Sequence, residues 1–307
     1  MKVSTNLFFD RASNQLGTVQ SSLSKTQEQL STGKQITKPS DEPDKASLVT
    51  RLESEMARQK SYQDTLASVE IKLSSQETAL RNVSDVMYRI KELTVQANSD
   101  TMGKLDRQSI AVEIESLRDQ VLSLANTQDT SGNYVFAGSR VTQPAFAANA
   151  KGVIDYHGDQ SRMQVAVGDN RRMNVNRPGS DAFTRVARDD GKGGKVGVGF
   201  FQALSDLANA VRGSDRANMQ RGIQEMDALQ QGVSDATAQI GSDLNVVDAQ
   251  KNVLDEVTLR LKTTLSSVQD LDYTEAITRM NRDQLALEAA QSSFAKISKL
   301  SLFNYLN

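Results

Sequence analysis

The residues that could do chemistry in this sequence are few, and His157 comes first because it is the only histidine. The chain has no cysteine, which excludes disulfides, thiolate metal sites and cysteine nucleophiles. A zinc site needs several His, Cys or acidic ligands, and the HExxH pattern of zinc peptidases is absent. We therefore predict no metal at His157 and place it in a turn between Tyr156 and Asp159.

Three further patterns fall short of a catalytic or binding motif. Arg171, Arg172 and Arg177 form a small basic patch, but no nucleic-acid motif surrounds it, so a solvated loop or a subunit contact is the better interpretation. The segment Gly191–Gly194 lacks the G-K-[ST] ending of a phosphate-binding loop. No GxSxG nucleophile element is present. The sequence thus predicts no enzyme and no cofactor.

The composition points away from a compact enzyme. Of 307 residues, 38% are hydrophobic and only 5% aromatic, which suits thin helical bundles better than a thick core. The formal net charge of −2 supplies no field for nucleic acid or for an anionic membrane. No apolar run reaches the roughly 18 residues of a membrane-spanning helix, so we predict no membrane segment.

A heptad stripe in the N-terminal half dictates what the rest of the chain must provide. Its members step by four and three without an intervening Pro or Gly. They are Tyr62, Leu66, Val69, Leu73, Gln76, Leu80, Val83, Met87, Ile90, Thr94 and Ala97. This spacing places an apolar seam along one side of a long helix. Because one helix cannot bury such a seam, it needs other long helices, from this chain or from copies of it.

Helices with similar spacing are predicted on both sides of this stripe. The first runs from about residue 12 to residue 30, with Gly33 as its C-terminal cap. Pro39 and Pro43 then interrupt the chain before the long helix begins. A third helix, antiparallel to the second, is expected to end near residue 129.

The last third of the chain is predicted to be helical as well. One helix is marked by Phe200 to Val211, and another by apolar residues from Met219 onward, which we expect to end at Gly241. A seven-residue repeat follows, and a last helix begins at the step from Asp270 to Tyr273. The repeat consists of Val247, Leu254, Leu261 and Val268.

Between residues 131 and 199 the pattern changes from helix to hairpin. Most of the glycines lie there, and short β-type runs alternate with turn residues. The runs are 134–136, 153–156, 163–167 and 173–175, and the Gly- and Lys-rich segment 189–199 is predicted to be a loop. The fold class is therefore mainly α: an elongated bundle of long coiled-coil-like helices from both chain ends, with a small inserted β-rich domain.

This order of elements resembles that of flagellins and their relatives, and the local sequences agree. Leu30–Ile36 followed by Ser40–Pro43 resembles the flagellin N-terminal signature, LSxGxxI with an acidic turn. Ile90–Ala97 resembles the RxRELxVQxxN segment. Asp270–Ala276 resembles the DxDYAxE start of the C-terminal helix, and Gln291–Leu306 resembles the closing segment.

Within the family, some features resemble the proteins that join the hook to the filament more than filament flagellins. The opening Met1–Thr5 resembles M-[RK]-[IV]-S-T, and Gly132–Phe146 resembles GxYxFxGxxxxxxPF. Tyr156–Phe183 resembles YxGD followed by VxVNxxGxxxF. The ending Leu302–Leu306 also fits the junction proteins better than the short flagellin terminus.

The resemblance implies a structural subunit of the bacterial flagellum that joins hook to filament. Its expected partners are copies of itself in a ring, the first hook-associated protein on the hook side, flagellin on the filament side, and a flagellar type III export chaperone. Neither nucleic acid nor membrane is expected as a partner. Export without a cleaved signal peptide would place it outside the cell. A minor filament flagellin and a non-flagellar coiled-coil adaptor are the alternatives.

The resemblance also implies a division into domains and an interface. Residues 1–43 and 272–307 would form an inner axial coiled coil, 44–130 and 200–271 a helical shaft, and 131–199 an outward β-rich domain. We expect both ends to be largely disordered in the free monomer and to fold on assembly. The predicted subunit-interface residues are Leu7, Leu16, Val19, Leu23, Leu30, Ile277, Met280, Leu287, Phe294, Ile297, Leu302, Phe303 and Leu306.

Overall fold

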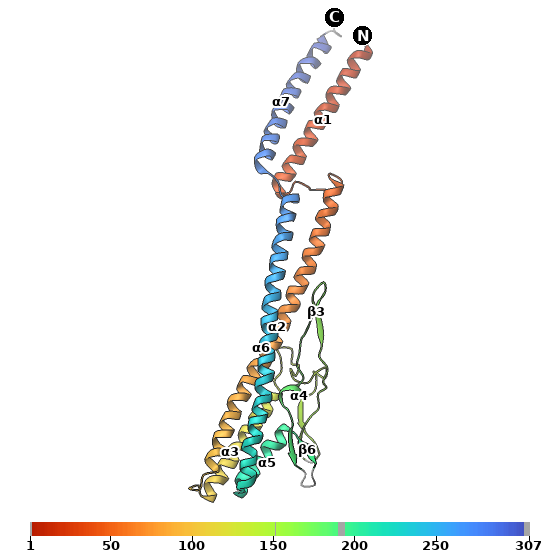
Figure 1. Ribbon diagram of the computed structural model, residues 1–307. Coiled ribbons are helices and arrows are strands. Elements are labelled where there is room, and N and C mark those ends of the chain that lie inside the picture. The colour runs from red at the N-terminus through yellow and green to blue at the C-terminus, as the bar shows by residue number, and fades with distance from the viewer. Residues whose placement is uncertain (1, 151, 190–193, 304–307) are drawn as a thin grey trace. The chain divides into compact units, whose positions relative to one another are not determined.

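The computed structural model describes residues 2–150, 152–189 and 194–303 (Figure 1). The chain divides into two compact units, one made of residues 1–59 and 256–307 and the other of residues 60–255. Two helices, α2 (Pro43–Ala97) and α6 (Arg216–Gln269), run from one unit into the other. The mainly α fold with long helices at both ends is confirmed.

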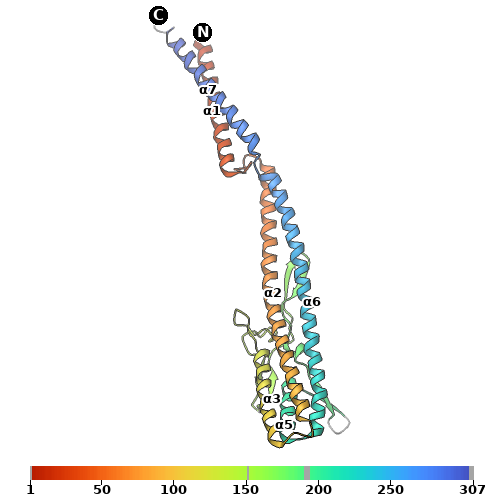
Figure 2. The ribbon, with the colours of Figure 1, turned by 90° about the vertical axis from the view of Figure 1, so that its left-hand side faces the viewer.

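The heptad stripe of α2 forms the centre of the hydrophobic core of the 60–255 unit. Leu66, Leu73, Leu80 and Ile90 are fully buried, as the spacing predicted. They pack with α3 (Lys104–Ala125), α5 (Phe200–Gly213) and α6, which lie beside α2 in Figure 2. Each such side chain stabilises the folded unit by about 1.5–3 kcal/mol relative to full exposure.

Helix α3 runs antiparallel to α2, as predicted. Arg89 of α2 pairs with Glu113 of α3 at 3.0 Å, and the Arg107 Nε donates to the Ala97 carbonyl oxygen at 2.9 Å. The helix ends at Ala125, before the predicted residue 129. The reason is Asn126, whose side chain exchanges two hydrogen bonds with the Phe146 backbone and so draws the chain toward the β-rich part.

The predicted helix end at Gly241 is wrong, because α6 continues to Gln269 without a break. Gly241 has no positive φ, and no neighbour stands where its Cβ would be. A helical glycine costs only about 1 kcal/mol relative to alanine. The buried repeat on both sides outweighs that cost. Its members are Met219, Met226, Val233, Ile240, Val247 and Leu254, all seven residues apart.

The middle of the chain forms three separate antiparallel hairpins, which confirms the predicted β-rich insertion. A short helix, α4 (Gly179–Ala182), lies between the second and third hairpins. The strands pair as β1 (Phe146–Ala148) with β2 (Ile154–Tyr156), β3 (Gln164–Gly168) with β4 (Arg171–Asn174), and β5 (Val186–Asp189) with β6 (Lys195–Val198).

Four strand assignments differ from the sequence prediction, and two of them are β1 and β5, which fall on no predicted run. Residues 134–136 form turns with one isolated bridge, Gln128 to Tyr134, and not a strand. Lys195–Val198 lies in the segment predicted to be a loop, yet it pairs with Val186–Asp189. Residues 190–193 lie outside the described residues. A two-residue alternation in so short and Gly-rich a segment is too weak a signal to separate strand from loop.

Five of the nine phenylalanines gather where the β-rich part meets α5. Their ring centroids are 5.0 to 5.9 Å apart, mostly edge to face. They are Phe136, Phe146, Phe183, Phe200 and Phe201. Aromatic pairs of this geometry add about 0.5–1.5 kcal/mol each beyond their buried area. A chain poor in aromatic residues therefore concentrates them at one place, the attachment of the hairpins to the helices.

The other unit contains the helices of both chain ends, α1 (Lys2–Thr32) and α7 (Tyr273–Phe303). Helix α1 begins at Lys2, ten residues before the predicted start, and so includes the apolar residues Leu7, Phe8 and Phe9. Among the described residues, no helix is both long and apolar enough to cross a membrane.

Candidate functional site

Helices α1 and α7 lie side by side in both views (Figures 1 and 2). Along the facing sides, seven of the predicted interface residues are partly buried. These are Leu16, Val19, Leu23, Leu30, Met280, Leu287 and Phe294. The Ser22 hydroxyl also donates to Asp283 at 2.7 Å across the pair. Two helices alone thus cover their common seam only in part.

Other predicted residues do not lie in this seam. Leu7 is 50% exposed, and Ile277 is 45% exposed because the neighbouring Ala276 takes the buried position. Leu285, which the prediction missed because it falls off the stripe, is 67% exposed. The side chains of Ile297, Leu302, Phe303 and Leu306 lie outside the described residues.

The most deeply buried residues of α1 are polar. Thr26 and Gln29 are almost fully buried, and the Gln29 amide nitrogen donates to the Gln35 carbonyl oxygen. The Gln29 side-chain oxygen is buried without a hydrogen-bond partner. A buried polar group with an unmet hydrogen bond costs stability, so α1 and α7 form a weakly stabilised pair.

A short backbone clip ties the two chain ends together below this pair. Lys34 and Asp270 form an isolated antiparallel bridge. The Leu271 amide donates to the Gly33 carbonyl oxygen at 3.0 Å, and the Gln35 amide donates to Gln269 at 2.7 Å. The clip therefore joins the two segments that resemble the N-terminal and C-terminal flagellin signatures, and it fixes the register of α1 against α7.

The side chains of these signatures have clear local roles. Gly33 has φ +70°, and an added Cβ would lie 2.8 Å from the Tyr273 hydroxyl, so glycine fits best here. Asp272 caps α7 by accepting hydrogen bonds from the amides of Thr274 and Glu275 at 2.9 and 3.1 Å. Both motifs thus serve the joint between helices and carry no reactive group.

The motifs of the β-rich part also have structural roles, because hydrogen bonds connect them to one another. Tyr156 donates its hydroxyl proton toward the carbonyl oxygens of Phe136 and Asp159, at 3.0 and 2.8 Å. Asp159 accepts hydrogen bonds from the Ser139 hydroxyl and amide and from the Ser161 amide. Gly138, at φ +70°, leaves room for Asp159. We call this arrangement the Tyr156–Asp159 knot.

Burial changes the acid–base properties of the knot. It raises the pKa of Tyr156 to about 12, because the charged phenolate would lose hydration. The hydrogen bonds from Ser139 and Ser161 lower the pKa of Asp159. Both shifts favour the form that makes these hydrogen bonds, so the knot keeps them at neutral pH.

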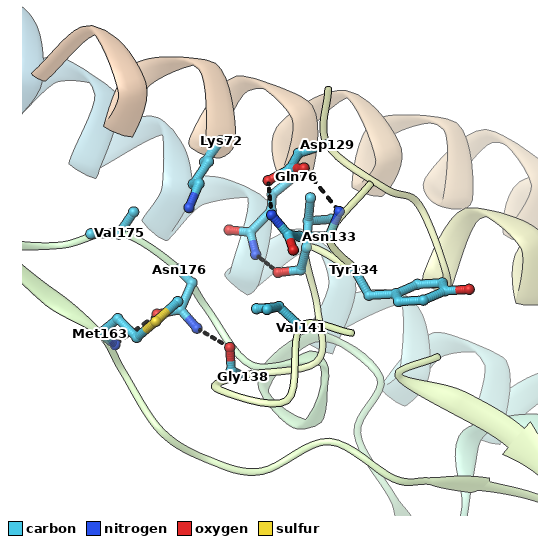
Figure 3. A pocket seen from close by; sticks show the side chains of 11 residues that line it. Lys72, Gln76, Asp129, Asn133, Tyr134, Gly138, Val141, Met163, Val175 and Asn176 are labelled. Carbon is cyan, nitrogen blue, oxygen red and sulfur yellow. Dashed lines mark hydrogen bonds between the residues drawn. The ribbon is translucent and has the colours of Figure 1, made fainter. Parts of the chain in front are cut away.

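A small cavity beside the knot, seen in Figure 3, is lined by apolar side chains, among them Val141, Met163 and Val175, and by the polar side chains of Gln76, Asn133 and Asn176. Gln76 of α2 donates to the carbonyl oxygens of Val135 and Arg177, and Asn176 donates to Gly138. The cavity holds about 20 Å³, room for about one water molecule. Gln76 therefore occupies a heptad position in order to anchor the hairpins to α2.

The arginines and the histidine of the β-rich part have structural surroundings. Arg177 pairs with Asp243 at 2.8 Å, and Arg171, an exposed residue of β4, donates to Gln250 at 3.0 Å. Arg171 and Arg172 therefore lie on a strand and not in a loop, and the subunit contact stays a prediction. His157 follows β2 in the predicted turn, and its amide donates to the Ala145 carbonyl oxygen. No group of three or more potential metal ligands occurs within the described ranges.

Comparison with known proteins identifies relatives over the whole chain. Flagellar hook-associated protein 3 of Escherichia coli (strain K12) is 28% identical, and that of Salmonella typhimurium is 26% identical, each over 99% of both chains. A flagellin of Bacillus subtilis is 24% identical over 97% of both chains.

Solved structures share the fold. A putative flagellar hook-associated protein from Vibrio parahaemolyticus matches 75% of this chain with a TM-score of 0.66 and 23% identity, over 100% of its own length. FlgL of Xanthomonas campestris matches 71% of this chain with a TM-score of 0.61 and 23% identity, over 99% of its own length.

Family models match both ends of the chain. The bacterial flagellin N-terminal helical region matches residues 3–141, and the bacterial flagellin C-terminal helical region matches residues 223–306. The two matches include every helix except α4 and α5, with α6 matched from residue 223 onward. The chain therefore belongs to the flagellin family.

Proposed function

We propose that this chain is a structural subunit of the bacterial flagellum that joins the hook to the filament. The observation that carries the proposal is the full-length match to two proteins named hook-associated protein 3, with 99% of each chain covered. The β-rich part supports it, because the motifs that resemble those of junction proteins build the Tyr156–Asp159 knot.

The axial interface is proposed to consist of α1 and α7. Their seam is only half covered by the pair itself, while Leu7, Ile277 and Leu285 are exposed. An exposed apolar row on a helix favours association with further helices. Copies of the chain, packed around a common axis, would cover these side chains together with the predicted residues at the end of α7.

The proposed setting follows from this role. The ring of copies lies between the first hook-associated protein and flagellin, outside the cell. The chain reaches it through flagellar type III export, with a chaperone on its C-terminal helix. It acts by packing and not by catalysis, which agrees with the structural roles of its conspicuous polar side chains.

The domain roles are part of the proposal. The clip at residues 33–35 and 269–271 marks the step between the axial helices and the shaft. A minor filament flagellin is the second candidate, favoured by the match to a Bacillus subtilis flagellin over 97% of both chains. The junction role is preferred because its relatives match over a larger share at higher identity.

The test is electron microscopy of cells that lack this chain, with a blot for flagellin in the medium. A junction subunit predicts hooks without filaments and flagellin monomers in the medium. Normal filaments without leaked flagellin would contradict the junction role and favour a minor flagellin or the non-flagellar adaptor.

A further inference from the structure

Helix α3 has a second stripe, opposite the buried one. Leu105 is 79% exposed and Val112 is 60% exposed, and Ser109 and Ser116 are exposed between and beyond them. The steps are four, three and four, the spacing of a coiled-coil seam. No charged residue belongs to this row, although α3 is otherwise rich in charge. A solvated helix face does not need such a pattern.

A matching row lies on α2, in the same unit of the molecule. Ile71, Ser75, Thr78 and Asn82 follow the same steps of four, three and four, and none is charged. They line an open groove of about 540 Å³ beside the end of α3, together with Leu124 and with Glu70, whose charge is paired with Lys251. Ile71 is 52% exposed within it. The groove is thus shallow and open, and the row of residues along it has the period of a helix.

The two rows fit each other between copies of the chain and not within one copy. We infer that the α3 row of one copy packs, antiparallel, into the α2 groove of the next copy. Leu105 then lies level with Asn82, Val112 with Ser75, and Ser116 with Ile71, so large side chains face smaller ones along the contact. Such alternation lets facing layers interdigitate.

Charge supports this register. Lys104 of one copy comes close to the level of Asp85 of the next, and neither residue forms an ion pair within its own described chain. Arg81, at the same end, is already neutralised by Glu77 at 2.6 Å. The contact therefore adds one pairing of opposite charges at the end of an uncharged seam.

The register also fixes the geometry of assembly. Within one copy, Glu113 pairs with Arg89. In the inferred contact between copies, residue 113 lies level with residue 74 of the neighbouring copy. The difference is about 15 residues of helix, so neighbouring copies are staggered by roughly 22 Å along α2. Because the two rows are different surfaces, the contact is head-to-tail and can propagate from copy to copy. The inference rests on the proposed function, whose ring requires contacts besides those of the axial helices.

The absence of native cysteine allows a direct test in the full chain. Thr78→Cys and Ser109→Cys fall level across the contact, whereas inside one copy they are separated by about 15 residues of helix, roughly 22 Å, too far for a disulfide. Flagella isolated from cells that produce the double variant as their only copy are oxidised and analysed by non-reducing electrophoresis. The expected result is a ladder of multimers in place of the monomer band.

The matched control is Thr78→Cys with Ser116→Cys, which keeps the same faces but shifts one cysteine by two helical turns. It should give at least ten-fold less cross-linked product, and equal yields would overturn the register. Monomer alone from the first variant, with the chain present in the flagella, would overturn the inference and leave the proposed function intact. A chain absent from the wild-type flagella would overturn both.

A second measurement separates contact from folding. Val112→Glu should abolish swimming in soft agar, and Ser75→Lys in the same chain should restore at least half of the swimming rate. Within one copy these two positions cannot meet, so rescue requires a neighbour. Failure of rescue, with both variants folded by circular dichroism, would contradict the antiparallel contact.

Discussion

At the residue scale, the surroundings of two glycines explain why the motifs of the β-rich part contain glycine at these positions. Gly138 and Gly132 both have positive φ, +70° and +79°, and so carry a similar backbone cost when replaced. They differ in their surroundings, because an added Cβ at Gly138 would lie 2.2 Å from Asp159 Oδ1, whereas nothing lies within 4 Å at Gly132.

Gly138→Ala should therefore destabilise the 60–255 unit by about 3 kcal/mol or more, and Gly132→Ala by about 1 kcal/mol. Urea unfolding followed by tyrosine fluorescence measures both, since the chain has no tryptophan. Equal losses would show that the space around Gly138 is not limiting.

The Tyr156 hydroxyl gives a prediction at high pH. Its pKa is raised to about 12 by burial, so the protonated form stabilises the fold below the ordinary pKa near 10, and this contribution is lost as pH rises toward 12. Tyr156→Phe should cost about 1–2 kcal/mol at pH 7, because two carbonyl oxygens lose their donor. The variant should also lose less stability between pH 10 and 12 than wild type does. A variant with the same alkaline loss as wild type would argue against Tyr156 as its source.

Asp159 gives the opposite dependence. Its pKa is lowered by hydrogen bonds from Ser139 and Ser161, so its carboxylate stabilises the fold above the ordinary pKa of 3.8, and this contribution disappears as pH falls through the lowered value. Asp159→Asn should be less stable than wild type at pH 7 and should show a flatter decline on acidification below pH 4. Parallel acid titrations of both proteins by circular dichroism provide the measurement.

At the scale of elements, the sequence predicts helices better than strands for a physical reason. The α2 stripe continues over ten steps, and a period sustained that long is difficult to imitate by chance. The strands have three to five residues, and their pairing depends on distant partners such as the five clustered phenylalanines around Phe183. No local pattern reveals these partners. The clip between Gly33 and Leu271 joins residues far apart in the chain, so a pattern within either segment cannot predict it.

The error at Gly241 leads to a stabilising prediction. The repeat from Met219 to Leu254 passes through this position, and the glycine lies in an ordinary helical conformation with open space around it. Gly241→Ala should raise the stability of α6 by up to about 1 kcal/mol, seen as a higher midpoint of thermal unfolding. Gly222→Ala is the control, because an added Cβ there would lie 2.5 Å from Leu207 Cδ1 and should destabilise. A lower midpoint for Gly241→Ala would mean that the helix needs the glycine.

At the scale of the whole molecule, the two units differ in how well they cover their own seams. In the 60–255 unit the seam residues of α2 and α6 are buried, whereas the α1 and α7 seam residues are only partly covered and the buried ones include Thr26 and Gln29. Ordering a residue costs about 1–2 kcal/mol of backbone entropy, which half-buried side chains offset poorly. The heptad periodicity is similar in both units, so it does not predict that their seams are covered to different extents. Only the resemblance to flagellins indicated this difference.

The free monomer should therefore show unequal protection against amide exchange. In hydrogen–deuterium exchange of the purified full chain, amides of α1 and α7 should exchange at least 100-fold faster than those of α2 around Leu80, because local opening of α1 and α7 leaves the 60–255 core intact. In isolated flagella the same amides should become protected, since neighbouring copies would cover Leu7, Ile277 and Leu285. Equal protection of terminal and central helices in the monomer would contradict folding on assembly, because the ends would then already be stable without a partner.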